Sequence, residues 1–142
     1  MILVDANLLL YAYYEDYAQN VAVRRWLDEV LLGEHRVGLP WPCLLAFVRL
    51  ATNPRLFSEP ATIHEAWAQV QNWLDCPCAW IPQAGERHRA VLASCLAAVS
   101  TSNGVPDAHL AALALEHGLT IYSADSGFSR FPGLRWVNPL AH

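Results

Sequence analysis

Apolar positions along the chain fall into two patterns, short uninterrupted runs and longer stretches in which they recur every three or four residues. Short runs bounded by polar or turn residues are typical of buried strands, and the periodic stretches are typical of amphipathic helices. The runs predict strands over residues 2–4, 36–39, 79–81, 119–122 and 135–137. The periodic stretches predict helices over residues 7–14, 17–32, 42–51, 62–74, 86–99 and 106–117.

Several of the predicted helix ends carry their own signals. Thr62, followed three residues later by Glu65, has the pattern of a capping box at the start of a helix. Gly33 and Gly118 each follow a helical stretch, where glycine commonly closes a helix. Pro106 is placed at a first helical position, which tolerates proline. These signals agree with the helix boundaries that the periodicity predicts.

Strands that alternate with helices predict an α/β fold, in which helices cover both faces of a mainly parallel sheet. A chain of 142 residues, 54% of them hydrophobic, is long enough to bury the core of one domain spanning residues 1–142. No apolar run reaches the ~18 residues of a membrane span, and the apolar N-terminus lacks the basic residues that begin a signal peptide. We therefore expect a cytoplasmic protein with no membrane segment.

The four cysteines are expected to stay reduced, mostly in the core. Cys76 and Cys78 are separated by a single residue, whereas structural zinc sites usually space their paired cysteines by about two to four residues. The cysteines therefore predict neither a zinc site nor a disulfide framework.

The net charge of −4 disfavours a nucleic-acid partner at first sight, but the charges are unevenly distributed. Residues 35–58 contain no acid and include Arg36, Arg49 and Arg55, and the chain after Asp125 is again free of acids. All the basic side chains are arginines, which suit bidentate contacts with phosphate. An anionic substrate could therefore meet a basic surface while the acids gather elsewhere.

Three aspartates occupy equivalent places in the predicted fold. Asp5 ends the first strand, Asp107 begins a helix, and Asp125 follows the strand over residues 119–122. In a parallel sheet these places share the carboxyl edge, where such folds bind their ligands. Three carboxylates gathered there would repel one another unless a cation neutralised them, and hard oxygen ligands favour Mg²⁺ or Mn²⁺.

Each of these acids also has a structural interpretation. Asp107 would favour a helix N-terminus through the helix dipole, and Asp125 suits an ordinary turn. Asp5 is harder to explain in this way, because it is flanked by apolar runs and is costly to bury without a partner. His109 is two residues from Asp107 on the same predicted helix, so the two side chains point in different directions, and a packing or solvent role is expected for His109.

At these residues the chain resembles the PIN domain family, specifically the VapC-type toxins of bacterial toxin–antitoxin pairs. No single matching motif is specific, but their order and spacing together are, and they extend over nearly the whole chain. The matching segments are residues 4–7, 47–49 with 52–54, 105–112, 122–125 with Phe128, and 136–140.

The resemblance implies a PIN-like three-layer α/β/α sandwich and a Mg²⁺- or Mn²⁺-dependent endoribonuclease. It also implies a cognate VapB-like antitoxin as inhibitor and a homodimer. Among the residues, Asp5 and Asp107 look like the principal metal ligands, and Asp125 looks like a further catalytic acid that acts directly or through water. Asn7 and Ser123 look like the groups that orient these carboxylates.

One position departs from the family pattern. PIN domains usually carry a glutamate three residues before the basic position matched here by Arg49, where this chain has Ala46. The site therefore has less negative charge than is usual, which favours weaker metal binding.

Two functions are compatible with the acids and the departure. The first is hydrolysis of RNA phosphodiesters by a metal-activated water, with Arg49 (and Arg36 and Arg55 as weaker candidates) holding phosphate. The second is a degenerate PIN fold that binds RNA or a protein partner without cutting, which Ala46 favours. A phosphatase of the haloacid dehalogenase type is disfavoured, because that chemistry needs an acid where this chain has Asn7 and a later lysine, which it lacks.

Overall fold

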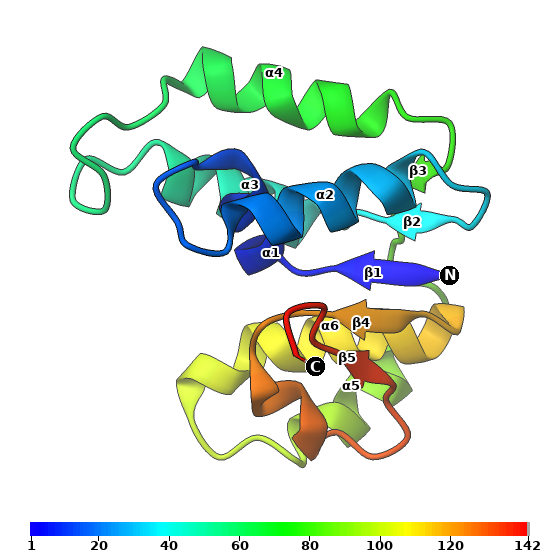
Figure 1. The fold of residues 1–142 in the computed structure, drawn as a ribbon. Coiled ribbons are helices and arrows are strands. Elements are labelled where there is room, and N and C mark those ends of the chain that lie inside the picture. Colours follow the sequence, from blue (N-terminus) through cyan, green and yellow to red (C-terminus); the bar gives the residue numbers. More distant parts are fainter. Residues whose placement is uncertain (142) are drawn as a thin grey trace.

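The computed structural model describes residues 1–141, and its centre is a sheet of five parallel strands (Figure 1). The strands are arranged across the sheet in the order β3-β2-β1-β4-β5. Their bounds are β1 Ile2–Val4, β2 Val37–Gly38, β3 Ala79–Trp80, β4 Thr120–Tyr122 and β5 Trp136–Val137. Every adjacent pair is parallel, so the predicted parallel sheet is confirmed.

Helices cover both faces of this sheet, as the predicted three-layer α/β/α sandwich requires. The first two crossovers carry α1 to α4 on one side, and the return from β3 to β4 carries α5 and α6 on the other (Figure 1). The right-handed rule for parallel crossovers explains this, because the direction of strand addition reverses after β3. The helices are α1 Ala6–Tyr13, α2 Asn20–Leu31, α3 Trp41–Ala51, α4 Ile63–Leu74, α5 His88–Leu96 and α6 Val105–His117, with short 3₁₀ helices η1 Ser102–Gly104 and η2 Ser126–Arg130.

Two of the helix-end signals act as predicted. The hydroxyl of Thr62 accepts a hydrogen bond from the backbone N–H of Glu65, and the Glu65 carboxylate accepts one from the N–H of Thr62, so the capping box is confirmed. Gly118 closes α6 with a φ of 68°, in the left-handed region that glycine adopts without strain.

Several predicted boundaries were wrong, among them the end of α5, which lies at Leu96 rather than at residue 99. Helix α2 begins at Asn20 rather than at residue 17, because the buried Asn20 amide donates to the carbonyls that end α1 and the chain turns between the two helices. The C-cap of α2 is Leu32, and Gly33 follows it without the positive φ of a glycine that closes a helix. Helix α5 begins at His88 rather than at residue 86, because the N–H groups of Gly85 and Arg87 bond to the Glu116 side chain.

The core surrounds the central strand β1. Leu3 pairs with Gly38 on one side and Ile121 on the other, and Leu3, Val4 and Ile121 are fully buried. Helix α1 follows β1 with only Asp5 between them, so this carboxylate lies where the buried strand leaves the sheet. The core therefore fixes the position of Asp5 through both elements beside it.

The four cysteines are free, and two of them, Cys43 and Cys95, are buried in the core, while Cys76 and Cys78 are half-buried. Across residues 1–141, no helix combines the length and the apolar character that crossing a membrane requires.

Candidate active site

Asp5 lies at the carboxyl edge of the sheet with both carboxylate oxygens engaged. Its backbone N–H donates to the carbonyl of Tyr122 on the neighbouring strand β4. Oδ1 accepts a 2.7 Å hydrogen bond from the N–H of Ala6, and Oδ2 accepts one of 2.8 Å from the hydroxyl of Ser123. Burial raises the pKa of Asp5, the charge of Asp125 adds to the rise, and the two hydrogen bonds oppose it.

Ser123 is the centre of a small hydrogen-bond network. Its side chain is fully buried, and its Oγ accepts from the amide of Asn7 at 3.2 Å and from the N–H of Asp125 at 3.0 Å. The other end of the Asn7 amide accepts from the N–H of Ala124 at 3.4 Å. With two donors directed at its oxygen, the hydroxyl directs its own proton to Asp5. This is the arrangement expected of groups that hold a carboxylate in one orientation.

Asp107 lies in the first turn of α6, close enough to the other two aspartates to interact with their charges. Burial, then Asp125, then Asp5 raise its pKa, while Arg130 lowers it. Arg130 Nη2 lies 3.1 Å from Asp107 Oδ2 in an ion pair. Asp125 itself is exposed, and its Oδ1 caps η2 by accepting from the N–H of Gly127 at 2.8 Å. The fold thus brings residues 5, 107 and 125 to one edge.

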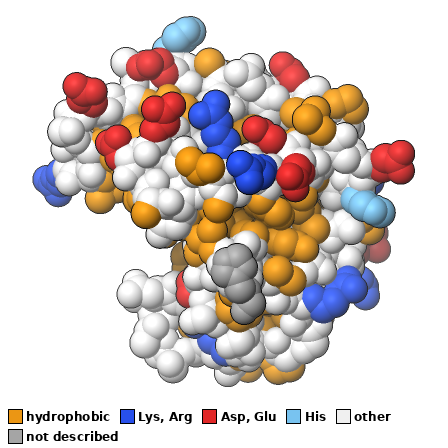
Figure 2. All heavy atoms as spheres, viewed as in Figure 1, with side chains coloured by type: hydrophobic (Ala, Val, Ile, Leu, Met, Phe, Trp, Pro, Cys, Tyr) orange, Lys and Arg blue, Asp and Glu red, His pale blue; other side chains and the backbone are white. Residues whose placement is uncertain are grey.

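The space-filling view shows how this edge is shaped. The molecule is hollowed on the side toward which β1 and β4 point in Figure 1, and an acidic side chain is visible inside the hollow (Figure 2). The surface there is therefore concave, as a site for an extended substrate requires.

Arg130 lies in a cradle formed by two glycines. A Cβ atom at Gly104 would lie 2.9 Å from Nη2 of Arg130, and a Cβ atom at Gly127 would lie 2.9 Å from Nη1. The guanidinium also lies 4.9 Å from the centre of the Phe131 ring. Because both glycines leave space for it, the guanidinium can reach Asp107 and supply its counter-charge.

Two side chains beside the acids were missed by the sequence reasoning. The Cys43 thiol lies 4.0 Å from Asp5 Oδ1, and burial, followed by the charge of Asp5, raises the pKa of Cys43 well above its usual range. Cys43 precedes Ala46 by one turn of α3, and this spacing would have been a signal for it. Arg130 lies five residues beyond Asp125 in the stretch without acids, which was identified only as a basic surface.

The three arginines predicted to hold phosphate lie in different places. Arg49 is exposed on α3, and within residues 1–141 no hydrogen bond or ion pair joins its side chain to the acids. Arg55 is exposed in the turn after α3. Arg36 precedes β2, at the opposite edge of the sheet from Asp5, and its guanidinium stacks on Trp80 at 4.2 Å. Its position makes Arg36 unsuitable as a phosphate ligand at this site.

The acids suit a hard divalent cation by their chemistry. Within the described part of the chain, no three His, Cys, Asp or Glu side chains form a ready-made metal-binding group. Asp5 and Asp107 are nevertheless partly desolvated oxygen donors whose pKa values are raised in part by neighbouring acids. Mg²⁺ and Mn²⁺ commonly bind through one or two carboxylates and keep several waters, which matches such a donor set.

Comparison with known proteins gives a consistent family. A model of the PIN domain matches residues 2–134. Ribonuclease VapC37 of Mycobacterium tuberculosis is 49% identical over 142 residues, covering 99% of this chain and 99% of the relative. Ribonuclease VapC43 of the same organism is 40% identical over 141 residues, covering 99% of this chain and 96% of the relative.

Solved structures share the fold at lower identity. The crystal structure of VapBC2 from Rickettsia felis, bound to a DNA fragment from their promoter, contains a chain that matches with a TM-score of 0.71 at 15% identity, covering 97% of this chain and 98% of that one. The crystal structure of FitAcB from Neisseria gonorrhoeae matches with a TM-score of 0.69 at 23% identity, covering 98% of each chain. At these identities the likeness establishes the three-layer fold.

Proposed function

The chain belongs to the PIN domain family, in its VapC-type branch, and on this premise we propose that it is a metal-dependent endoribonuclease toxin of a VapBC-type pair, acting in the cytoplasm. The observation that carries the proposal is the meeting of Asp5, Asp107 and Asp125 at one edge of the sheet, where the charge of Asp125 adds to the raised pKa of Asp5 and the charges of Asp125 and Asp5 add to that of Asp107. The relatives named as ribonucleases support the choice of RNA as substrate.

Asp5 and Asp107 would hold a Mg²⁺ or Mn²⁺ ion, with Asp125 contributing directly or through water. When bound, such an ion supplies Lewis acidity for hydrolysis of a phosphodiester. Ser123 and Asn7 keep the Asp5 carboxylate oriented through the 2.8 Å and 3.2 Å hydrogen bonds that they make.

Two arginines have separate roles in the proposal. Arg130 neutralises Asp107 through the ion pair and gives up this contact when a divalent ion takes its place. Arg49 remains a candidate for holding a more distant phosphate, because it is exposed on α3 and its guanidinium suits bidentate contacts.

A degenerate PIN fold that binds RNA or a protein without cutting is the second candidate. Ala46 favours it, because the glutamate usual at that position is missing, and the pairing of Asp107 with Arg130 favours it as well. Calorimetric titration with Mn²⁺ distinguishes the two functions. Binding at or below millimolar concentration is expected for the nuclease, and no binding would favour the degenerate module.

A VapB-like antitoxin and a second copy of the chain are the proposed protein partners. The matching solved structures contain VapBC2 and FitAB, which supports a partner of this kind. A hollow of about 520 Å³ between α2 and α4 has a mixed lining, with Leu31 and Trp73 beside the charged Arg24 and Asp28. Large apolar side chains are also exposed at Val21 and Leu32, as expected where another chain docks.

Sequencing of RNA ends after brief expression tests the nuclease directly. The wild-type chain should generate new 5′ ends and arrest growth, and Asp5→Asn and Asp107→Ala should do neither. Cleavage of purified RNA in Mn²⁺ by the wild type, at a rate that Asp5→Asn does not change, would remove the central role from Asp5.

A further inference from the structure

We propose that the hollow between α3, α6 and the loop after β3 is a subsite for an unpaired nucleobase of the RNA, next to the phosphate that is cut. This inference rests on the proposed nuclease function and adds a base-reading element to it. The hollow has a volume of about 270 Å³. The residues that carry the argument are Trp41 and Pro42 on α3, Pro82 and Gln83 in the loop, and His109 on α6.

One wall of the hollow is flat and apolar. Trp41 lies at its edge with 37% of its surface exposed, and Trp67 stacks near-parallel to it at 6.3 Å with an interplanar angle of 12°. Pro42 and Pro82 add flat, rigid surfaces. Unpaired bases stack on such aromatic side chains when a protein binds single-stranded RNA.

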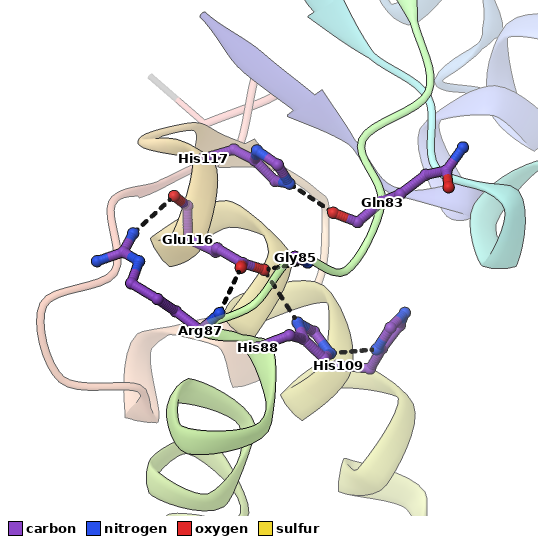
Figure 3. A network of polar contacts seen from close by, with 7 residues as sticks. All are labelled: Gln83, Gly85, Arg87, His88, His109, Glu116 and His117. Atoms are coloured by element: carbon purple, nitrogen blue, oxygen red, sulfur yellow. Dashed lines mark hydrogen bonds and ion pairs between the residues drawn. The ribbon is translucent and has the colours of Figure 1, made fainter.

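The opposite wall presents a fixed histidine. His109 Nδ1 lies 3.1 Å from His88 Nε2, and His88 Nδ1 lies 3.5 Å from Glu116 Oε1 (Figure 3). The Glu116 carboxylate is held in turn by the N–H groups of Gly85 and Arg87, at 3.0 and 3.2 Å. This chain of contacts from α6 to α5 and back holds the His109 ring in place.

The tautomer of the histidine pair decides which hydrogen bond His109 can offer. His88 Nδ1 lies 3.5 Å from Glu116 Oε1 but makes no hydrogen bond among the described residues. In the tautomer in which His109 Nδ1 donates to His88 Nε2, the Nε2 of His109 is an acceptor, and it has no hydrogen-bond partner among residues 1–141. An N–H group on the edge of a base is the complementary donor.

Gln83 supplies a second polar group at the rim. Its backbone carbonyl is 2.6 Å from His117 Nε2, which anchors the loop to the end of α6. Figure 3 shows its side-chain amide extending away from this network. An amide carries both donors and an acceptor, so Gln83 can bond to a base edge in combination with His109.

Two of the residues that line the hollow are close in sequence to residues at the acids. Cys43 directly follows Pro42, and its Sγ lies 4.0 Å from Asp5 Oδ1. On the other wall, His109 follows Asp107 within the first two turns of α6. On this proposal, an RNA strand whose phosphate binds at Asp5 and Asp107 places a neighbouring base against Trp41.

The test combines a protein variant with an RNA that lacks one base. Binding of single-stranded RNA oligonucleotides is measured by fluorescence anisotropy with the Asp5→Asn variant, which is expected not to cut them. In a series of oligonucleotides, an abasic nucleotide replaces each position in turn. Adding Trp41→Ala should weaken binding of intact RNA about tenfold. In the Asp5→Asn variant, an abasic nucleotide at one position should weaken RNA binding by a similar factor. In the double variant with Trp41→Ala, the same abasic nucleotide should weaken binding no further.

Controls separate stacking from general effects. Trp41→Phe should retain most of the affinity, and Leu45→Ala, an exposed apolar residue one turn further along α3, should change nothing. Trp41→Ala should have the same oligomeric state as the wild type, measured as the mass of the particle in solution. A changed oligomeric mass would assign Trp41 to a protein interface and overturn the base subsite. The subsite would also be overturned if the loss of affinity from Trp41→Ala and the loss from the abasic position multiplied, because independent losses mean that the base does not contact Trp41.

Cleavage supplies an independent measurement. His109→Ala and Gln83→Ala should still cut RNA in Mn²⁺ but with a changed preference for the base next to the cut. If the wild type cuts RNA and neither these variants nor Trp41→Ala changes the preferred sites, the subsite is wrong and the nuclease stands. If the wild type cuts no RNA, the nuclease proposal fails, and the binding measurements still decide whether a base occupies the hollow.

Discussion

Ser123 donates a 2.8 Å hydrogen bond to Asp5 across a separation of 118 residues in the sequence. The bond joins the ends of β1 and β4, which are neighbours in the sheet. It therefore depends on correct pairing of the two strands, and it orients the acid that the proposed chemistry needs most.

Ser123→Ala should weaken Mn²⁺ binding about tenfold or more, because loss of a group that orients a metal-binding carboxylate typically costs about 10–100-fold in affinity. It also removes a hydrogen bond that lowers the pKa of Asp5. Isothermal titration calorimetry measures the affinity. Ser94→Ala, in which the lost hydroxyl is exposed on α5, is the matched control, and equal affinities for the two variants would exclude the orienting role.

As the pH is lowered, Mn²⁺ binding should be lost at a higher pH than it would be at aspartates with an ordinary pKa. Burial raises the pKa values of Asp5 and Asp107, so protons compete with the metal above the usual aspartate range near about 4. The stabilisation of the fold by Mn²⁺ should be largest near neutral pH and decline in mild acid.

Without metal, the contribution of Asp5 and Asp107 to the stability of the fold should decrease as the pH rises. A carboxyl group whose pKa is raised by folding contributes stability below its unfolded pKa, and that contribution is lost as the pH rises through the folded value. Thermal unfolding across mildly acidic to neutral pH, with and without Mn²⁺, checks both trends. Asp5→Asn should reduce both, and an unchanged pH profile in that variant would contradict the assignment.

Arg130→Gln should strengthen Mn²⁺ binding, because the guanidinium that pairs with Asp107 competes with the metal. The pair is partly exposed, so we expect a gain of about 0.5–1 kcal/mol, or roughly two- to fivefold in affinity. Arg135→Gln removes an equal charge from a residue that bonds to the carbonyl of Gly118 instead. The same gain in both variants would indicate a general charge effect rather than competition at Asp107.

Ala46→Glu should also tighten Mn²⁺ binding, by adding a carboxylate one helical turn from Cys43, whose thiol is 4.0 Å from Asp5. Ala46→Gln has nearly the same size without the charge and serves as the control. Calorimetry should show a gain for the glutamate alone. A loss of affinity for both variants would mean that the side chain at residue 46 blocks the site.

Thr62→Ala should lower the free energy of unfolding by about 1 kcal/mol, the typical cost of losing an N-cap. Both halves of the capping box are present at this residue. Thr101 begins η1 without any side-chain capping bond, so Thr101→Ala should cost much less. Urea unfolding of the two variants measures the difference, and equal losses would show that the capping bonds of Thr62 are not the cause.

The features that were predicted correctly depend on short-range patterns. The acid after β1, the capping box at Thr62 and the glycine closing α6 are each visible within a few residues. The features that were missed depend on contacts between distant segments. Arg130 reaches Asp107 only because two glycines leave room for it, and the delayed start of α2 depends on Asn20 bonding to the preceding helix.

The position of the first strand has a consequence for synthesis on the ribosome. Strand β1 lies in the middle of the sheet, and its neighbour β4 is separated from it by most of the chain. Asp5 therefore cannot receive its hydrogen bond from Ser123 until the 118 residues that separate them have been synthesised. A nascent chain that stops before residue 107 holds Asp5 without the other acids, so the site assembles only after strand β4 is made.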